Sequence, residues 1–292
     1  MKLIDAGKRF YKGNTHAHTT LSDGRRTPEQ VKKMFSENGY DFLVISDHWH
    51  TVPTEKYGDM LVLSGMEFDY MLSTQALHVV GVFPNAEAVQ GFSRGRMDYQ
   101  MLIDAINARG GAAIAAHPAW SLNTPEFLKS LNGICAVEVY NSFSGEPWNA
   151  ARADSSQILD VAAANGWVVP QVAADDCHFY EGEELKSYIM LQADELTPEG
   201  VIAALKAGSF YASQGPEILD AQIEGDELIL HTSPVCMCTF ASNLVWVDGR
   251  CRVGENMTEH VCPLHRAEGE TYIRCEITDD KGRKAWLSPV KL

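Results

Sequence analysis

The sequence predicts an α/β fold of parallel strands joined by helices, followed by a small antiparallel β unit. Up to about residue 215, short runs rich in Val and Ile alternate with segments that carry helix-start signals. Beyond Gly215-Pro216, alternating strands are separated by Gly-Asp, Asp-Gly and Lys-Gly turns. With 292 residues, 45% of them hydrophobic and 22% charged, the chain can bury a sizeable core.

The expected strands follow one another at intervals that leave room for helices. They end within the segments 15–18 (THAH), 42–48 (FLVISDH), 61–68 (LVLSGMEF), 112–118 (AAIAAHP), 136–141 (AVEVYN), 168–178 (VVPQVAADDCH) and 188–193 (YIMLQA). The run 76–83 follows a strand with no helix between, so we expect it to pair as a hairpin. We place the boundary at residue 215, which gives a domain of residues 1–215 and a small β domain of residues 216–292.

The helices between these strands have recognisable starts. Thr27 is followed by Pro28 at the first helical position and by Gln30 three residues on, which is a capping box. Gly39 is expected to end that helix. Thr-Pro pairs at 124–125 and 197–198 repeat the same start.

Composition excludes several classes of protein. The 39 acidic and 24 basic side chains give a formal charge of −15, which disfavours binding to nucleic acid. No apolar stretch is long enough to span a membrane, and the first residues lack the apolar region of a signal peptide, so we expect a cytoplasmic protein. The seven cysteines are then expected to be reduced. The oligomeric state stays open.

Nearly every expected strand before residue 215 ends in a His, Asp, Glu or Asn. These residues are His16, His18, Asp23, Asp47, His48, Glu67, His78, His117, Asn141, Asp175, Asp176 and His178. In a barrel of parallel strands all carboxyl ends meet on one face, where active sites are built. The sequence therefore predicts that imidazoles and carboxylates converge there.

Such a cluster points to metal ions. Side chains at i and i+2 of a strand share a side, so His16 and His18 can hold one ion, as can Asp176 and His178. Several carboxylates in one pocket could not all stay ionised without cations. Two or three ions would remove this conflict, activate a shared water and neutralise charge on a phosphoryl oxygen.

The motifs NTHAHTTLSDG, VISDH, GMEF, AAHP and ADDCH, in this order, resemble those of the PHP (polymerase and histidinol phosphatase) metallohydrolases. The resemblance spans residues 14 to about 215. It implies a distorted (β/α)7 TIM-like barrel with a trinuclear metal site, and a phosphoesterase acting on a small phosphorylated molecule.

The resemblance also implies a role for each matched position. His16 and His18 would bind the first metal with Glu67 and Asp176, and Glu67 would bridge to a second metal. The second metal would also be held by His78 and His117, and the third by Asp23, His48 and His178. Some relatives have His where this sequence has Asp23. The resemblance therefore does not decide whether a third metal is bound. Mixed nitrogen and oxygen ligands favour Zn, Mn or Fe over Mg or Ca.

Other polar residues have two interpretations each. Asp47 could orient His48 or move a proton, or it could cap the next turn. Asn141 could orient the substrate, whereas Glu138 is interpreted as structural. Trp49, Trp120 and Trp148 could wall the pocket or pack in the core. The candidate phosphate-binding cations, which could equally form surface salt bridges, are Arg25, Arg26, Arg94 and Arg96.

The expected reaction is attack of a metal-bound hydroxide on phosphorus at a di- or trinuclear site, with Glu67 and Asp47 as the catalytic side chains. The stretch KAGSFYASQGPEI also resembles the barrel exit of carbaryl-hydrolase-like members of the family. A carboxylic ester or carbamate hydrolase is therefore one alternative. A non-catalytic metal-binding regulatory module is the other.

Overall fold

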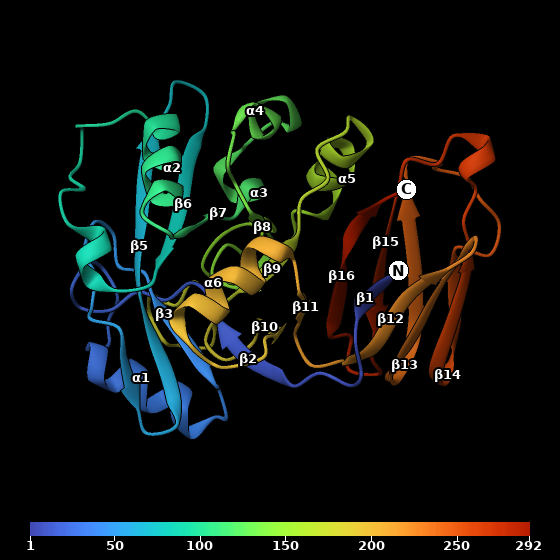
Figure 1. Ribbon diagram of the computed structural model, residues 1–292, viewed down its shortest axis with the longest axis horizontal. Helices are drawn as coiled ribbons and strands as arrows, with labels where there is room; N and C mark the ends of the chain where they lie inside the picture. The colour runs from blue at the N-terminus through green and yellow to red at the C-terminus, as the bar shows by residue number, and fades with distance from the viewer.

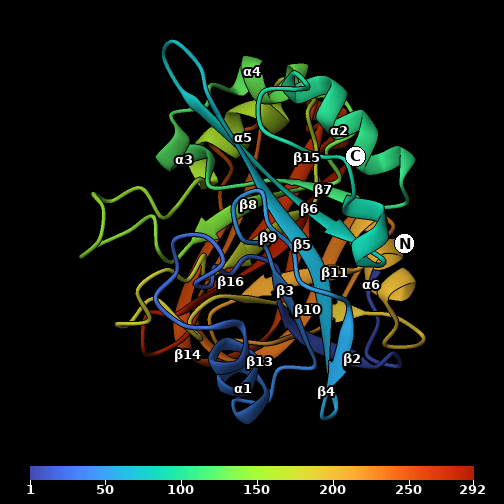
Figure 2. The ribbon, with the colours of Figure 1, turned by 90° about the vertical axis from the view of Figure 1, so that its left-hand side faces the viewer.

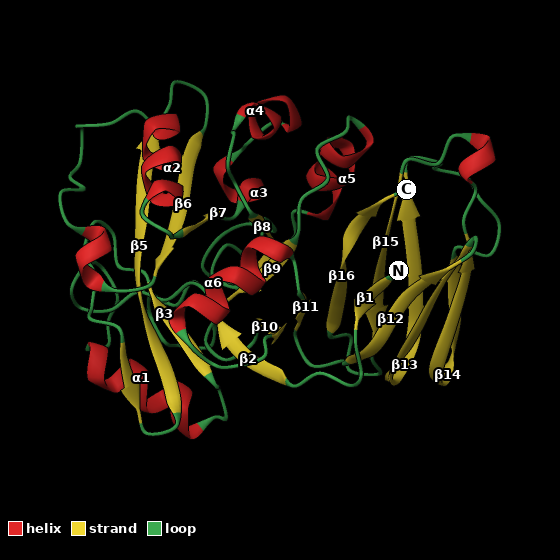
Figure 3. Ribbon diagram, viewed as in Figure 1, coloured by secondary structure: helices red, strands yellow, loops and turns green.

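The computed structural model describes residues 1–292, and its strands form one long mixed sheet with helices along one part of it (Figures 1 and 3). The strands are β1 (Lys2–Ile4), β2 (Phe10–Asn14), β3 (Phe42–Ile45), β4 (Glu55–Tyr57), β5 (Met60–Met71), β6 (Ala76–Phe83), β7 (Ala112–Ala115), β8 (Ala136–Asn141), β9 (Gln171–Ala174), β10 (Tyr188–Gln192), β11 (Phe210–Ser213), β12 (Ile218–Glu224), β13 (Glu227–Ser242), β14 (Cys251–Pro263), β15 (Tyr272–Thr278) and β16 (Lys284–Lys291). The α-helices are α1 (Pro28–Glu37), α2 (Tyr99–Ala108), α3 (Pro118–Ser121), α4 (Pro125–Ser130), α5 (Ser156–Ala164) and α6 (Pro198–Ala207).

The mixed α/β class is confirmed, but a closed barrel is not. The sheet runs β1-β12-β13-β15-β16-β11-β10-β2-β3-β5-β6-β7-β8-β9, and its two ends do not pair. Several neighbours inside the expected barrel are antiparallel: β5 with β6, β6 with β7, and β10 with both β2 and β11. Parallel neighbours need a crossover of a dozen or more residues. Only four residues, 72–75, separate β5 from β6, so these strands form the expected hairpin.

The helix starts follow the sequence signals. The Thr27 side chain accepts a hydrogen bond from the backbone of Gln30, and the Gln30 side chain accepts one from the Thr27 backbone, which completes the capping box. The side chains of Thr124, before α4, and Thr197, before α6, likewise accept a hydrogen bond from the backbone N–H of the third residue of the helix. Helix α1 ends at Glu37 with Asn38 as its cap, one residue before the expected Gly39.

The carboxy-terminal strands form an antiparallel unit that is joined to the rest of the chain (Figure 1). Its strand β12 pairs with β1, and its strand β16 pairs with β11. The ring of Trp286 on β16 is fully buried and stacks on Tyr140 of β8 with 5.6 Å between ring centres. Because the sheet passes residue 215 in this way, the division into residues 1–215 and 216–292 stays a prediction.

In Figure 2, α2 and α6 lie to the right of β5, β6 and β7. In the hydrophobic core beneath α6, Val44, Leu63 and Val82 from the strands and Val201 and Leu205 of the helix are fully buried. None of the helices has both the length and the apolar composition needed to span a bilayer.

Candidate metal centre

The segments that follow β2 and β9 lie side by side, although these two strands do not pair within the sheet. The backbone N–H of His18 donates to the carbonyl of Cys177 at 3.0 Å, and that of Asp176 donates to the carbonyl of His16 at 3.0 Å. This short parallel bridge places the first and last motifs of the sequence against each other.

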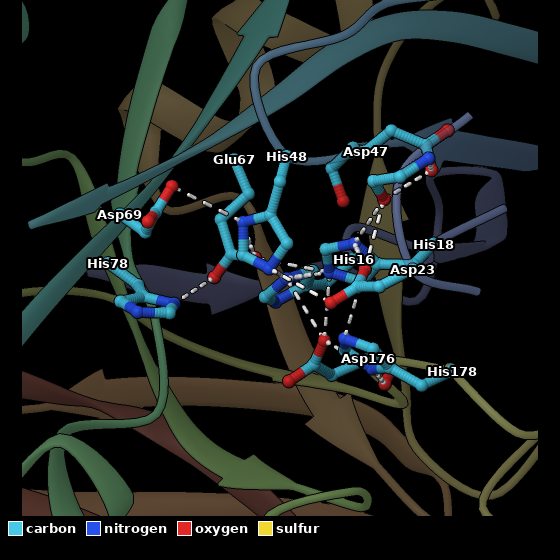
Figure 4. Close-up of polar contacts among 12 residues, drawn as sticks. His16, His18, Asp23, Asp47, His48, Glu67, Asp69, His78, Asp176 and His178 are labelled. Atoms are coloured by element: carbon cyan, nitrogen blue, oxygen red, sulfur yellow. Dashed lines mark hydrogen bonds and ion pairs between the residues drawn. The ribbon is translucent and has the colours of Figure 1, made fainter. Parts of the chain in front are cut away.

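The side chains of these segments converge with those from β3, β5, β6 and β7, as Figure 4 shows for most of them. Their ligand atoms form three overlapping groups, and within each group all atoms lie within 4.8 Å of one another. The groups are His16, His18, Glu67 and Asp176; Glu67, His78 and His117; and His18, Asp23, His48 and His178. The structure thus brings together all nine residues predicted as metal ligands.

Glu67 is the centre of this arrangement. One carboxylate oxygen lies 2.8 Å from His78 Nδ1 and 3.2 Å from His117 Nε2. The other oxygen lies within 3.3 Å of ring nitrogens of His16, His18 and His48. Burial alone would raise the pKa of this carboxyl group, but the surrounding histidines, His16 first, hold it well below its usual range.

The pKa values of two histidines in the cluster are raised, and that of a third is lowered. Burial would lower the pKa of His18, but the adjacent carboxylates of Asp176 and Glu67 raise the pKa to about 9. The pKa of His16 is also raised: burial opposes the rise, and the charges of Asp176 and Glu67 outweigh it. The pKa of His178 is instead lowered, by burial and then by neighbouring His18.

The donor set fits divalent cations. His16 Nε2 and His18 Nε2 face each other at 3.1 Å, and both also lie within 3.3 Å of oxygens of Glu67 and Asp176. Asp176 Oδ1 and His48 Nδ1 are buried and have no hydrogen-bond partner. Lone pairs directed at a shared point suit a metal ion, and mixed imidazole and carboxylate donors suit Zn, Mn or Fe.

Two of the converging residues have an unusual backbone. His117 has a φ of 29° and Asp176 a φ of 56°, both in the left-handed region that non-glycine residues rarely adopt. Such conformations persist where the surroundings enforce them, often at functional sites. Here they turn the two side chains toward Glu67, whose carboxylate His117 contacts directly.

A cavity of about 300 Å³ opens over the metal centre. Its polar lining comes from the centre itself and from Ser144. The remaining lining residues are aromatic: Trp120, Phe143 and Phe179. No Lys or Arg lines the cavity.

Comparison with solved structures finds proteins of similar fold. Neither a family model nor a curated protein sequence matches the chain. A solved two-domain protein from Bacteroides vulgatus, containing a predicted PHP-like metal-dependent phosphoesterase, is 15% identical, with 99% of this chain and 96% of that chain covered and a TM-score of 0.55. The chain has a PHP-like fold.

Two further solved structures are less similar. A proposed metal-dependent phosphoesterase from Bifidobacterium adolescentis is 15% identical, covers 57% of this chain and 87% of its own, and has a TM-score of 0.40. An amidohydrolase from Chromobacterium violaceum, with bound sulfate and no metal, is 14% identical, covers 67% and 96%, and has a TM-score of 0.46. The resemblance to carbaryl-hydrolase-like members stays a prediction.

Glu138, which the sequence analysis interpreted only as structural, contacts the candidate ligands directly. Its buried carboxylate accepts hydrogen bonds from His16 Nδ1 at 2.8 Å, from the backbone N–H of His117 at 2.8 Å and from Asn141 Nδ2 at 2.7 Å. The contact with His16 leaves Nε2 of that ring free to face the centre. The sequence did indicate that Glu138 lies near the site, because it is on the same expected strand as Asn141, which was predicted to lie there.

Asn141 lies in this same network, and the structure does not place it where a substrate would bind. It is fully buried and donates to Glu138 and, at 3.2 Å, to Asp176 Oδ2. It does not line the cavity. Its contacts support positioning of the two carboxylates rather than the predicted contact with substrate.

We expect Glu138→Gln to weaken metal binding about 10-fold to 100-fold, as loss of a partner behind a ligand typically does. An amide nitrogen facing the His16 ring would favour the tautomer with the proton on Nε2, whereas one facing His117 and Asn141 would oppose two donors. Titration against a metal-chelating dye measures the affinity. Glu126→Gln, at an exposed position of α4, is the matched control. Equal affinities in the two variants would contradict the role.

Asp47 does not line the cavity. One carboxylate oxygen accepts from the backbone N–H of Thr19 at 2.7 Å and from Ser22 Oγ at 2.7 Å, and the other accepts from Thr19 Oγ1 at 2.7 Å. The carboxylate is fully buried by this loop. The geometry therefore disfavours a catalytic role in proton transfer. Asp47 caps the turn of residues 19–22, which precedes it in the chain, and not the next turn as the other interpretation had it.

The candidate phosphate-binding arginines lie outside the cavity, on exposed loops. Arg25 pairs with Glu181 at 2.7 Å, and Arg94 pairs with Asp69 at 2.8 Å. Arg26 and Arg96 are exposed, and neither lines the cavity. For Arg25 and Arg94 the structure favours the salt-bridge interpretation over phosphate binding.

Proposed function

We propose that the protein is a metal-dependent phosphoesterase that hydrolyses a small phosphorylated molecule. The observation that carries this proposal is the Glu67 carboxylate, which lies between two groups of potential metal ligands and belongs to both. The PHP-like fold supports it, since the Bacteroides protein with this fold is described as containing a predicted metal-dependent phosphoesterase.

The three overlapping groups would hold two or three divalent ions. His16, His18, Glu67 and Asp176 form the first position, and Glu67 with His78 and His117 forms the second. Asp23, His48 and His178 form the third, with His18 also in reach. Bound Zn, Mn or Fe would supply Lewis acidity, which polarises phosphoryl oxygens and lowers the pKa of water.

The chain itself prepares the imidazoles for this role. Nδ1 of His16 contacts Glu138, Nδ1 of His117 contacts Ser121 Oγ at 3.0 Å, and Nδ1 of His178 contacts the carbonyl of Asp176 at 2.8 Å. The carboxylate of Glu138 and the carbonyl of Asp176 can only accept, so they select the tautomer of His16 and His178 in which Nε2 carries a lone pair toward the centre, and the Ser121 hydroxyl can accept from His117 in the same way.

One observation favours a second candidate, a carboxylic ester or carbamate hydrolase using the same ions. No Lys or Arg lines the cavity, so a neutral ester would meet no unpaired protein cation there. Parallel assays of Mn- or Zn-loaded protein on phosphate monoesters, phosphate diesters and aryl acetates separate the two. Turnover of phosphate esters supports the proposal, and cleavage of aryl acetates alone would overturn it.

Metal removal distinguishes either hydrolase from a non-catalytic metal-binding module. We expect chelation to abolish turnover while the far-ultraviolet circular dichroism stays unchanged, because the cores beneath the sheet are closed without the site residues. Readdition of Mn or Zn should restore turnover. Unfolding on chelation, together with no activity on the whole ester panel, would support the regulatory module instead.

A further inference from the structure

We propose that the substrate carries a planar aromatic group next to the scissile ester, and that this group is held between Trp120 and the Phe143–Phe179 pair. This inference rests on the proposed hydrolase function and adds the class of substrate. It starts from the composition of the cavity, in which every lining side chain outside the metal centre is aromatic except Ser144.

The aromatic rings stand at two ends of the imidazole cluster. Trp120 contacts the second group edge to face, with ring centres 5.0 Å from His117 and 5.5 Å from His78. Phe143 stacks on His178 of the third group at 4.2 Å. A planar group bound over the centre would therefore meet a ring on either side.

Neighbouring residues hold the Phe143–Phe179 end in place. The two rings pack edge to face at 5.1 Å, and Trp148 packs on Phe179 at 5.1 Å. The Arg25 guanidinium lies 4.0 Å from the centre of the Phe179 ring. Yet Phe143, Phe179 and Trp120 all remain partly exposed toward the cavity. Ordered aromatic surface that stays open is suited to bind an apolar planar partner.

The charges of the cavity disfavour other substrates. The nearest guanidinium groups, on Arg25 and Arg94, already pair with Glu181 and Asp69. A second phosphate group on the substrate would find no free cation and would lie near Asp23. A sugar would have Ser144 as its only neutral polar side chain in the lining. A single aromatic ring is the group for which the residues outside the metal centre offer matching contacts.

The size of the cavity agrees with this class. Its volume of about 300 Å³ lies at the lower end of the range for small-molecule sites, which is about 300–1,000 Å³. One ring and its ester fill such a space, whereas a polymer would not enter it.

Benzyl phosphate and cyclohexylmethyl phosphate provide the test. Both are monoesters of primary alcohols of similar size, so they differ chiefly in whether the ring is planar and aromatic. We expect the metal-loaded protein to favour benzyl phosphate about tenfold in kcat/KM. Phe179→Leu and Trp120→Leu should each reduce this preference severalfold. Trp246→Leu, at a tryptophan that is 92% exposed far along the chain, should leave it unchanged.

Binding gives a readout that does not need turnover. Calorimetric titration of the metal-loaded protein with benzylphosphonate and cyclohexylmethylphosphonate should show the same preference in Kd. Equal values for both pairs of compounds would overturn the aromatic inference and leave a phosphoesterase intact. Preferential binding of benzylphosphonate without cleavage of any phosphate would instead overturn the phosphoesterase and support the aromatic site. If one variant fails to fold, the other variant and the comparison of compounds on the unaltered protein still decide.

Discussion

Glu67→Gln should lose bound metal and hydrolase activity together. The carboxylate contacts ring nitrogens of five histidines through its two oxygens. An amide would carry no charge and would present an NH2 group to imidazoles on one side. We expect roughly a 10³-fold fall in kcat/KM, the size seen when a preorganised electrostatic group is removed from an active site.

Elemental analysis of the purified variant and a steady-state assay measure the two effects. His265→Ala is the control, because this histidine lies in the carboxy-terminal unit and its ring pairs only with Glu268, at 3.8 Å, among the charged groups. The control should keep its metal and its activity. Full activity in Glu67→Gln would remove the bridging role that the resemblance implies for this residue.

Asp160→Ala should destabilise the protein by about 3 kcal/mol, the lower end of the cost of breaking a buried ion pair from one side. Asp160 on α5 binds the guanidinium of Arg274 on β15 through both oxygens, at 2.6 Å and 2.7 Å. Arg274 is 6% exposed, and Tyr272 donates to the same carboxylate at 3.3 Å. The substitution would leave a buried guanidinium with its main partner lost.

Urea unfolding monitored by circular dichroism measures this effect. Lys33→Ala is the matched control, because Lys33 and Glu37 form an exposed pair 3.8 Å apart, and its loss should cost less than about 0.5 kcal/mol. Bound metal per chain should be unchanged in both variants. An unaltered denaturation midpoint in Asp160→Ala would show that this pair does not help to hold α5 against the antiparallel unit.

Local patterns explain why much of the fold could be predicted. A capping box or a Thr-Pro start is complete within four residues, so Thr27, Thr124 and Thr197 sit before helices as expected. The hairpin of β5 and β6 could be predicted because the segment between them is too short to hold a helix. Whether the sheet closes depends on how β2 and β9, which are more than 150 residues apart, lie relative to each other, and no local pattern encodes this.

In the candidate site, too, local patterns could be predicted and contacts between distant segments could not. Alternation along a strand predicts that Asp175 and Asp176 point in opposite directions. Asp175 accepts backbone hydrogen bonds from residues 185–187, while Asp176 faces the imidazoles. The contact of Glu138 with the candidate ligands could not be predicted, because His16 and His117 come from the ends of other strands. The arginines had the correct charge for phosphate, but acidic neighbours distant in sequence hold two of them at the surface.

The sequence by itself determined which chemistry is available: histidines and carboxylates at strand ends, spaced so that one rim could collect them. Only the tertiary structure decided which of these side chains face one another. Asp47 and His48 are adjacent, yet the loop of residues 19–22 binds the first while the second faces Glu67. The reason is physical: residue type and spacing act within a few residues, whereas the partner of a buried charge is set by packing between distant segments.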